Sequence, residues 1–265
     1  MVDRRRRRND DWRPGELNVK RQVVVNAATQ DLVISQDTNT SMPGHVLWEV
    51  AVVVARLLDQ GALPFDVAGR SVLELGAGCG VAGMAFALHG ASVVFTDLPA
   101  LVPHLEANVR RNLGPPMEQP CEWAVIPYDW TDTIPNRLRG RHFDLVLATD
   151  CVYHAHLVDP LLDALRAVAD PTSTLLLVYE RRDPDVLARF EAELKRAFKV
   201  KRPIPVHRLR HLLGDDLLFR LRGGDTPEDA EWLTILACRR KRADYNKFRA
   251  ARREDGASSS AREVT

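Results

Sequence analysis

The sequence lacks the features of a secreted, membrane-spanning or zinc-finger protein. Only four of its 265 residues are cysteines, and none of them forms a C-x-x-C pair. Neither a zinc finger nor a disulfide framework is therefore expected. The longest strongly apolar run, Val50–Ala55, is far shorter than the ~20 residues that a membrane span needs. Polar residues follow the arginine run at 4–8, which excludes an ordinary secretory signal. We expect a soluble intracellular protein with no membrane partner.

The sequence also lacks a charge excess overall, because 37 Lys and Arg residues stand against 36 Asp and Glu, a formal net of +1. The basic residues gather at the two ends. Residues 1–13 hold six basic and three acidic residues (net +3), and residues 239–265 hold nine and four (net +5). Subtracting both from +1 leaves −7 for residues 14–238. An acidic body repels phosphate backbones and attracts lysine-bearing surfaces, so we expect a protein partner and not nucleic acid.

Composition divides the chain into three parts. Residues 1–20 are polar and arginine-rich and predict a mobile basic arm, and residues 243–265 predict a disordered basic tail. Between them, residues 21–242 form a single domain of ordinary globular composition, since apolar residues make up 45% and charged residues 28% of the chain. Two short β-branched runs, 23–25 and 32–34, predict a hairpin or an edge strand.

From residue 71 onward, short apolar runs alternate with helical patterns. The predicted strands are 71–75, 92–95, 122–126, 143–147, 175–179 and 232–238. The predicted helices are 44–61, 79–89, 101–113, 157–168 and 184–198. Strands separated by helices indicate an α/β fold with a parallel sheet covered on both faces. The pattern is weakest in residues 207–229, where a strand and a long loop are expected.

Residues 72–80 (Val-Leu-Glu-Leu-Gly-Ala-Gly-Cys-Gly) run from a predicted strand through glycines into a helix. Glycines let the backbone approach a ligand closely, and a helix N-terminus offers free N–H donors. In one register, Gly78, Gly80 and Gly83 match the dinucleotide fingerprint G-x-G-x-x-G, with Asp97 19 residues after Gly78 for ribose hydroxyls.

In the other register, Gly76, Gly78 and Gly80 form the loop, Glu74 lies inside the strand and Asp97 closes the next strand. The first glycine of a dinucleotide motif follows its strand directly, and here that glycine is Gly76. None of the four tyrosines has a lysine four residues later, as a short-chain dehydrogenase of this size would need. Both facts favour the second register, and the placement of Asp97 argues against a glycine turn with no ligand.

The segment Glu74–Gly80 resembles motif I of the seven-β-strand S-adenosylmethionine-dependent methyltransferases, and Asp97 resembles the acidic residue that ends their second strand. The resemblance narrows to methyltransferase family 16, the protein-lysine methyltransferases that include those acting on chaperones, valosin-containing protein and translation factors. The segments similar to that family are Gly44–Trp48, Tyr128–Trp130, Asp150–Tyr153 and Val178–Arg182. The resemblance covers roughly residues 44–180, and more weakly extends to 238.

The resemblance implies a class I methyltransferase fold, which is a Rossmann-like, seven-stranded, mostly parallel sheet with helices on both faces. It also implies S-adenosylmethionine as cofactor. Ligands of open α/β sheets bind outside the carboxyl ends of the strands, where Gly76, Asp97 and Asp150 should converge. The cofactor-binding residues implied by the family are Trp48, Glu74, Gly76, Ala77, Gly78, Asp97, Trp130 and Thr149.

Each of these residues has an expected role. Residues 76–78 would line the amino-acid and ribose portion of the cofactor, and Asp97 would accept hydrogen bonds from the ribose hydroxyls. Trp130 would pack against adenine, and the backbone of Thr149 would border the cofactor. Trp48 is expected at the methionine end. For both tryptophans packing is the alternative, in the core for Trp48 and at the sheet edge for Trp130.

Asp150 and Tyr153 are the expected catalytic residues. A lysine acceptor must be neutral although its free pKa is ~10.4, so an apolar slot has to disfavour the charged form. Asp150 would orient the amine, and the ring of Tyr153 would border the methyl path. In the alternative interpretation, Asp150 caps a helix and Tyr153 packs on the sheet. Glu180 is either a rim residue near substrate or an ion-pair partner of a neighbouring arginine.

The same motif separates the substrate classes. Amino-methylases acting on adenine or glutamine carry Asn/Asp-Pro-Pro-Tyr/Phe here, and Cys151 and Val152 replace both prolines. A pair of glutamates suited to arginine is absent, and the histidines show no metal-ligand spacing with cysteines, so no metal is expected. The sequence predicts a protein-lysine N-methyltransferase. A methyltransferase for RNA or a small molecule and a non-catalytic cofactor-binding module are the alternatives.

The resemblance also sets expectations about partners and location. It implies a protein substrate such as a chaperone, an AAA ATPase or a translation factor. A monomer in the cytoplasm, and also in the nucleus, is expected.

Overall fold

The structure is a computed structural model that describes residues 22–27, 30–115, 123–201, 233–248 and 250. The expected basic arm and the segment 207–229 lie outside the described residues. Within the described ranges, no helix is long and apolar enough to cross a membrane.

Seven strands form the main sheet. They are β3 (Ser71–Leu75), β4 (Ser92–Asp97), β5 (Trp123–Pro127), β6 (Leu145–Thr149), β7 (Thr174–Glu180), β8 (Phe198–Val200) and β9 (Leu233–Arg240). Their order across the sheet is β5-β4-β3-β6-β7-β9-β8. The pairs from β5 to β7 are parallel, and β9 is antiparallel to both β7 and β8. The predicted seven-stranded, mostly parallel sheet is therefore confirmed.

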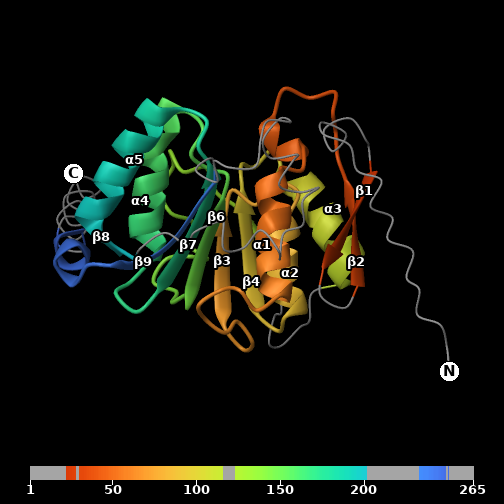
Figure 1. The fold of residues 1–265 in the computed structure, drawn as a ribbon, viewed down its shortest axis with the longest axis horizontal. Coiled ribbons are helices and arrows are strands. Elements are labelled where there is room, and N and C mark those ends of the chain that lie inside the picture. Colours follow the sequence, from red (N-terminus) through yellow and green to blue (C-terminus); the bar gives the residue numbers. More distant parts are fainter. Residues whose placement is uncertain (1–21, 28–29, 116–122, 202–232, 249, 251–265) are drawn as a thin grey trace, which may run out of the picture.

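Helices cover both faces of this sheet (Figure 1). They are α1 (Glu49–Asp59), α2 (Val81–Leu88), α3 (Val102–Leu113), α4 (Val158–Val168) and α5 (Pro184–Ala197), with short 3-10 turns η1 (Pro43–His45) and η2 (Ala155–Leu157). Side chains alternate along a strand, so Val72 of β3 packs with α1–α3, while Leu73 and Leu75 pack with α4 and α5. Both apolar faces of β3 are buried, which explains why the run 71–75 predicts that strand at its observed bounds.

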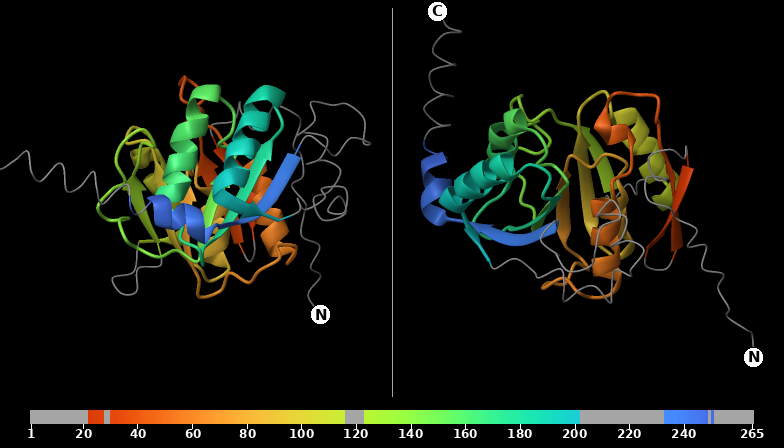
Figure 2. Two further views of the ribbon diagram at one scale, coloured as in Figure 1. Left: turned by 90° about the vertical axis from the view of Figure 1, so that its left-hand side faces the viewer. Right: turned by 45° about the horizontal axis from the view of Figure 1, so that its top comes forward.

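A separate antiparallel hairpin, β1 (Gln22–Ala27) and β2 (Gln30–Ser35), confirms the hairpin prediction. Two asparagines on α3 bond to the edge of β2 as another strand would. Asn108 accepts a hydrogen bond from the Ser35 N–H at 2.9 Å, and Asn112 accepts one from the Val33 N–H at 2.7 Å. Figure 2 shows the hairpin beside α3 in its right-hand view.

Several predicted element bounds differ from the structure by one or two residues, as in the strand expected at 92–95, which ends at Asp97. Two differences have a clear physical cause. The helix expected from Gly44 begins only at Glu49, because η1 is followed by an extended segment. That segment is held by the Gln36 side chain, whose Oε1 accepts a hydrogen bond from the Leu47 N–H at 2.6 Å. The strand expected at 143–147 runs from Leu145 to Thr149. Asp144 lies just before it, where its side chain accepts hydrogen bonds from the backbone N–H and the hydroxyl of Ser71.

The chain after β9 differs from the tail that the sequence predicts, because residues 242–248 are helical. Arg240 holds this helix against the domain, and its side chain is almost fully buried. Its guanidinium contacts the rings of Tyr245 and Phe248 at 5.1 and 4.8 Å, pairs with Asp244 at 3.0 Å and donates to the Ala169 carbonyl at 2.9 Å. The expected tail therefore starts with an anchored helix.

Candidate active site

The glycine loop after β3 brings separate predicted residues together. Gly76, Gly78 and Gly80 have positive φ angles of 64°, 54° and 84°, a conformation that only glycine adopts readily. A Cβ added at Gly76 would lie 2.9 Å from Cys151 Sγ and 3.0 Å from Trp130 Cζ2. The loop therefore packs against the expected adenine-side tryptophan and against the segment that contains Asp150.

Asp97, the last residue of β4, is linked to this loop by hydrogen bonds. Its Oδ2 accepts from the Gly78 N–H at 2.7 Å, and its Oδ1 accepts from the Leu98 N–H at 2.7 Å. Burial raises the pKa of the Asp97 carboxyl, and the two backbone hydrogen bonds oppose that rise. Ala77 donates its N–H to the Thr96 carbonyl at 3.0 Å, which fixes the loop to the end of the same strand. The loop and the acidic end of β4 thus meet as predicted.

Glu74 lies beneath the loop and not on its open side. The residue is fully buried, and its Oε2 accepts a hydrogen bond from the Gly83 N–H at 3.0 Å. A Cβ at Gly83 would clash with that same oxygen and with the Phe95 ring, so the third glycine of the rejected register serves packing. Burial raises the pKa of Glu74 to about 8. Its observed contact is with the start of α2, and its role at the cofactor stays a prediction.

The segment before α1 runs along the other side of the glycine loop. A Cβ at Gly78 would lie 3.4 Å from the Gly44 carbonyl oxygen. Trp48, the residue just before α1, is half-buried and donates its indole N–H to the Pro43 carbonyl at 3.0 Å. The structure therefore does not make Trp48 a core tryptophan, and it places this residue at the rim of the site.

Asp150 follows β6 in a conformation that is rare for a residue other than glycine, with φ of 55°. Its N–H donates to the Val178 carbonyl at 2.7 Å, and its Oδ1 accepts from the Glu180 N–H at 3.4 Å. The cap positions of η2 and α4 are His154 and Leu157, so the helix-cap alternative for Asp150 is wrong. A backbone strained in this way and held by neighbouring strands is typical of functional sites.

Burial raises the pKa of Asp150 to about 6, and the positive charge of Arg182 opposes that rise. Thr149 is the last residue of β6, and its carbonyl accepts a hydrogen bond from Cys151 Sγ at 3.4 Å. Tyr153 is half-buried with its ring 4.8 Å from that of His154. Burial also raises the pKa of Tyr153, so its hydroxyl stays protonated at neutral pH.

Arg182 is a residue of the site that the sequence does not single out. Its Nη2 pairs with Asp150 Oδ2 at 2.5 Å, its Nε pairs with Glu180 Oε2 at 2.8 Å, and its guanidinium carbon lies 4.7 Å from the Trp48 ring centroid. Glu180 is therefore an ion-pair partner, one of the two roles that the sequence left open. The two adjacent arginines after β7 were the available signal, although the sequence does not say which of them faces the site.

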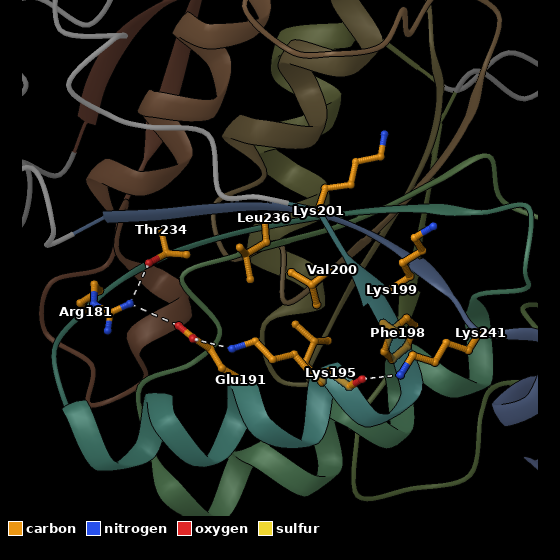
Figure 3. Close-up of a pocket in the computed structure, with 11 residues that line it drawn as sticks. Arg181, Glu191, Lys195, Phe198, Lys199, Val200, Lys201, Thr234, Leu236 and Lys241 are labelled. Carbon is orange, nitrogen blue, oxygen red and sulfur yellow. Dashed lines mark hydrogen bonds and ion pairs between the residues drawn. The ribbon is translucent and has the colours of Figure 1, made fainter.

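The neighbouring Arg181 extends to a different place. A hollow of about 490 Å³ lies between α5 and strands β8 and β9, and Figure 3 shows Arg181 there with dashed lines to Glu191 and Thr234. Arg181 Nη1 is 3.2 Å from Glu191 Oε1 and 3.3 Å from Thr234 Oγ1. None of the predicted site residues lines this hollow, so it is separate from the candidate active site.

Among the described residues, no group of three or more His, Cys, Asp and Glu side chains is placed to hold a metal ion. The site consists instead of a glycine loop, an acidic strand end and a strained aspartate at the carboxyl edge of a mostly parallel sheet. This combination matches the site expected of a methyltransferase of the seven-strand class, and it lies at the edge where open α/β sheets bind their ligands.

Comparisons with known proteins narrow that class. A family model described as lysine methyltransferase matches residues 26–197, and the chain belongs to that family. Protein N-lysine methyltransferase METTL21A of Danio rerio is 32% identical over 178 residues, which cover 66% of this chain and 77% of the relative. The Mus musculus protein of the same name is 34% identical over 170 residues, covering 63% and 75%.

Solved structures agree on the fold. The Thermus thermophilus 16S rRNA N2 G1207 methyltransferase RsmC, in complex with AdoMet and guanosine, superposes with a TM-score of 0.52 at 16% identity, covering 83% of this chain and 50% of that one. At this identity the likeness concerns the fold alone.

Proposed function

We propose that this chain transfers a methyl group from S-adenosylmethionine to the side-chain amine of lysine in a protein substrate. Membership of the lysine methyltransferase family supports the donor and the acceptor class, and the chain is an S-adenosylmethionine-dependent methyltransferase. The observation that carries the proposal is the buried carboxylate of Asp150, whose neighbour Cys151 contacts the glycine loop. The carboxylate that would orient the lysine amine thus lies next to the glycine loop that would bind the cofactor.

The residues at the loop are suited to this cofactor. The strained glycines let the backbone approach a ligand, and each Asp97 oxygen accepts one backbone N–H and keeps a lone pair for a ribose hydroxyl. Trp130 lies beside Gly76 and is partly buried against the core, and its indole would stack on adenine. Gly76 and Gly78 would line the amino-acid and ribose portion, Asp97 would bind the ribose and Trp130 would pack against adenine. Trp48 would border the methionine end.

When bound, S-adenosylmethionine supplies a methyl group on a sulfonium, whose carbon–sulfur bond breaks to leave a thioether as the nitrogen–carbon bond forms. The acceptor nitrogen needs a free lone pair, so its ammonium group must first release a proton to solvent. Asp150, ionised above pH about 6, orients the amine. Positive charge develops on the nitrogen during transfer, and the Asp150 carboxylate and the face of Tyr153 stabilise it.

The substrate protein is proposed from the relatives. One of them is named EEF1A lysine methyltransferase 3 in Mus musculus, 31% identical over 136 residues that cover 51% of this chain and 55% of the relative. That name supports a translation factor as substrate, and chaperones and AAA ATPases remain further candidates. We propose that the enzyme acts as a monomer on cytoplasmic or nuclear proteins, and the net charge of −7 for residues 14–238 favours lysine-bearing surfaces.

Labelled methyl transfer tests the proposal. The purified chain is incubated with a cell lysate and methyl-labelled S-adenosylmethionine, and the labelled protein is hydrolysed for amino-acid analysis. We expect the label on lysine, and its loss with Asp150→Asn. Asp163→Asn on α4, where the side chain is 64% exposed, should keep full activity. Label found only in nuclease-sensitive or small-molecule products would contradict the proposal.

A further inference from the structure

The guanidinium of Arg182 occupies a place with the properties of a cation-binding site. It pairs with Asp150 at 2.5 Å and Glu180 at 2.8 Å, and lies 4.7 Å from the centroid of the Trp48 ring. These three partners come from different elements: the start of α1, the loop after β6 and the end of β7. Two carboxylates and an indole face are groups that bind any compact organic cation, including an alkylammonium.

A third acidic side chain, that of Glu49, follows Trp48 directly in the sequence as the first residue of α1. Burial raises the pKa of Glu49 most, the charges of Glu180 and Asp150 raise it further, and Arg182 lowers it. The Arg182 guanidinium pairs with two of these three acidic side chains, Asp150 and Glu180. Among the described residues, the three acidic side chains outnumber the one arginine, so this end of the site is acidic and is not the apolar slot that the sequence predicts.

This place coincides with the acceptor end of the candidate active site. Asp150 is the residue expected to orient the substrate amine, and its Oδ2 is the oxygen that Arg182 contacts. A lysine in water carries its proton at neutral pH, so it arrives as an ammonium group that seeks the same carboxylate. Two cations beside one buried carboxylate repel each other strongly.

We propose that Arg182 is a resident competitor for the substrate lysine: its guanidinium fills the acceptor's cation subsite, and a productive substrate displaces it. The inference rests on the proposed function, because it takes the acceptor to be an amine. It makes Arg182 a residue that determines specificity. The apparent affinity for a substrate is reduced when the subsite is open in only a small fraction of the enzyme. A lysine on an arbitrary protein gains too little binding energy to displace the arginine, whereas a substrate that makes further contacts gains enough.

The surroundings of Arg182 allow such a displacement. Its side chain is 32% exposed, whereas that of Asp150 is 5% exposed, so the guanidinium can move outward while the carboxylate stays. The next residue back, Arg181, points into the hollow beside α5 and pairs with Glu191. Arg181 carries the same charge one position away, and its side-chain contacts among the described residues are with Glu191 and Thr234, outside the subsite. It therefore provides a matched control.

Binding of n-butylammonium, the side chain of lysine without its backbone, tests the proposal by calorimetry in the presence of S-adenosylhomocysteine. Arg182→Gln should bind it about tenfold more tightly than the natural protein, because the competing cation is gone. Arg182→Lys keeps a competing cation and should stay near the natural affinity. Arg181→Gln should leave the affinity unchanged, which separates local competition from the general effect of removing a positive charge.

Two outcomes would overturn the inference. One is that Arg182→Gln, with thermal unfolding that matches the natural protein, binds n-butylammonium no more tightly than the natural protein does. Absence of binding by both proteins counts as this outcome. The other is an equal gain with Arg181→Gln. With a protein substrate that the enzyme methylates, Arg182→Gln should lower KM. If Arg182 merely positioned Asp150, the same substitution would instead lower kcat at unchanged KM. The n-butylammonium result does not depend on where the methyl label goes, so failure of the proposed lysine activity would be seen separately.

Discussion

The Gly78 N–H donates a hydrogen bond to Asp97 Oδ2 across 2.7 Å, and so couples the glycine loop to the end of the neighbouring strand. The other oxygen, Oδ1, accepts from the Leu98 N–H at the same distance. One carboxylate thus orders the loop backbone while both its oxygens keep lone pairs for a ligand. The loop geometry and the ribose contact expected of Asp97 are therefore properties of a single side chain.

Asp97→Asn should weaken S-adenosylmethionine binding at least tenfold in calorimetry. The amide turns one acceptor into a donor that faces a backbone N–H, and leaving that group unpaired costs about 1–3 kcal/mol. Thermal unfolding should accordingly shift down as well. The control is Asp132→Asn, an exposed aspartate in the turn after Trp130, which should change neither property. Unaltered cofactor affinity in Asp97→Asn would exclude the ribose contact.

Gly76→Ala and Gly69→Ala separate backbone strain from steric fit. Both glycines have positive φ, 64° and 71°, so either alanine should destabilise the fold by about 1–2 kcal/mol. A Cβ at Gly69 meets nothing within 4 Å, whereas one at Gly76 crowds Cys151 and Trp130. We expect Gly76→Ala to lose cofactor binding and Gly69→Ala to keep it. Equal affinities at matched stability would show that the packing of Gly76 is irrelevant to the site.

The sequence predicts the parts of this fold whose pattern is local. The run 71–75 and the glycines after it determine β3 and its loop, and Asp97 is placed by the end of the next strand. The start of α1 could not be predicted in this way. Val46 and Leu47 continue the helical spacing of the apolar residues from Val50 onward. The Gln36 side chain nevertheless accepts a hydrogen bond from the Leu47 N–H and keeps the segment extended.

The site follows the same division. Its glycine loop and its aspartates are recognisable in the sequence, while the direction of each arginine after β7 depends on partners elsewhere in the chain. Arg181 reaches Glu191 and Arg182 reaches Asp150. Nothing in the dipeptide itself distinguishes them, so the cation in the acceptor subsite becomes visible only in three dimensions.

The pH dependence of kcat/KM tests the role of Asp150. Deprotonation of the acceptor lysine, whose pKa is ~10.4, makes log kcat/KM rise by about one per pH unit up to alkaline pH. Because the pKa of Asp150 is raised to about 6, its protonation should steepen the slope to about two below that pH. Asp150→Asn should be at least about 100-fold less active and lack the break. A break that survives in Asp150→Asn would assign it to another group.

Glu74→Gln should change how stability depends on pH. Burial raises the pKa of Glu74 from 4.5 to about 8 in the folded state, so the folded chain holds a proton that the unfolded chain releases. The stabilising contribution is complete below pH about 4.5 and is lost as the pH rises to about 8, at up to about 1.4 kcal/mol per pH unit.

Glutamine stays neutral and its amide oxygen can still accept from the Gly83 N–H. In denaturant unfolding without cofactor at pH 9, Glu74→Gln should therefore be more stable than the natural protein, and the advantage should vanish near pH 5. Glu106→Gln, on the exposed face of α3 with its side chain 43% exposed, should show no such pH-dependent difference. A constant difference between Glu74→Gln and the natural protein across this range would mean that Glu74 is ionised in the folded state and that a charge lies beneath the glycine loop.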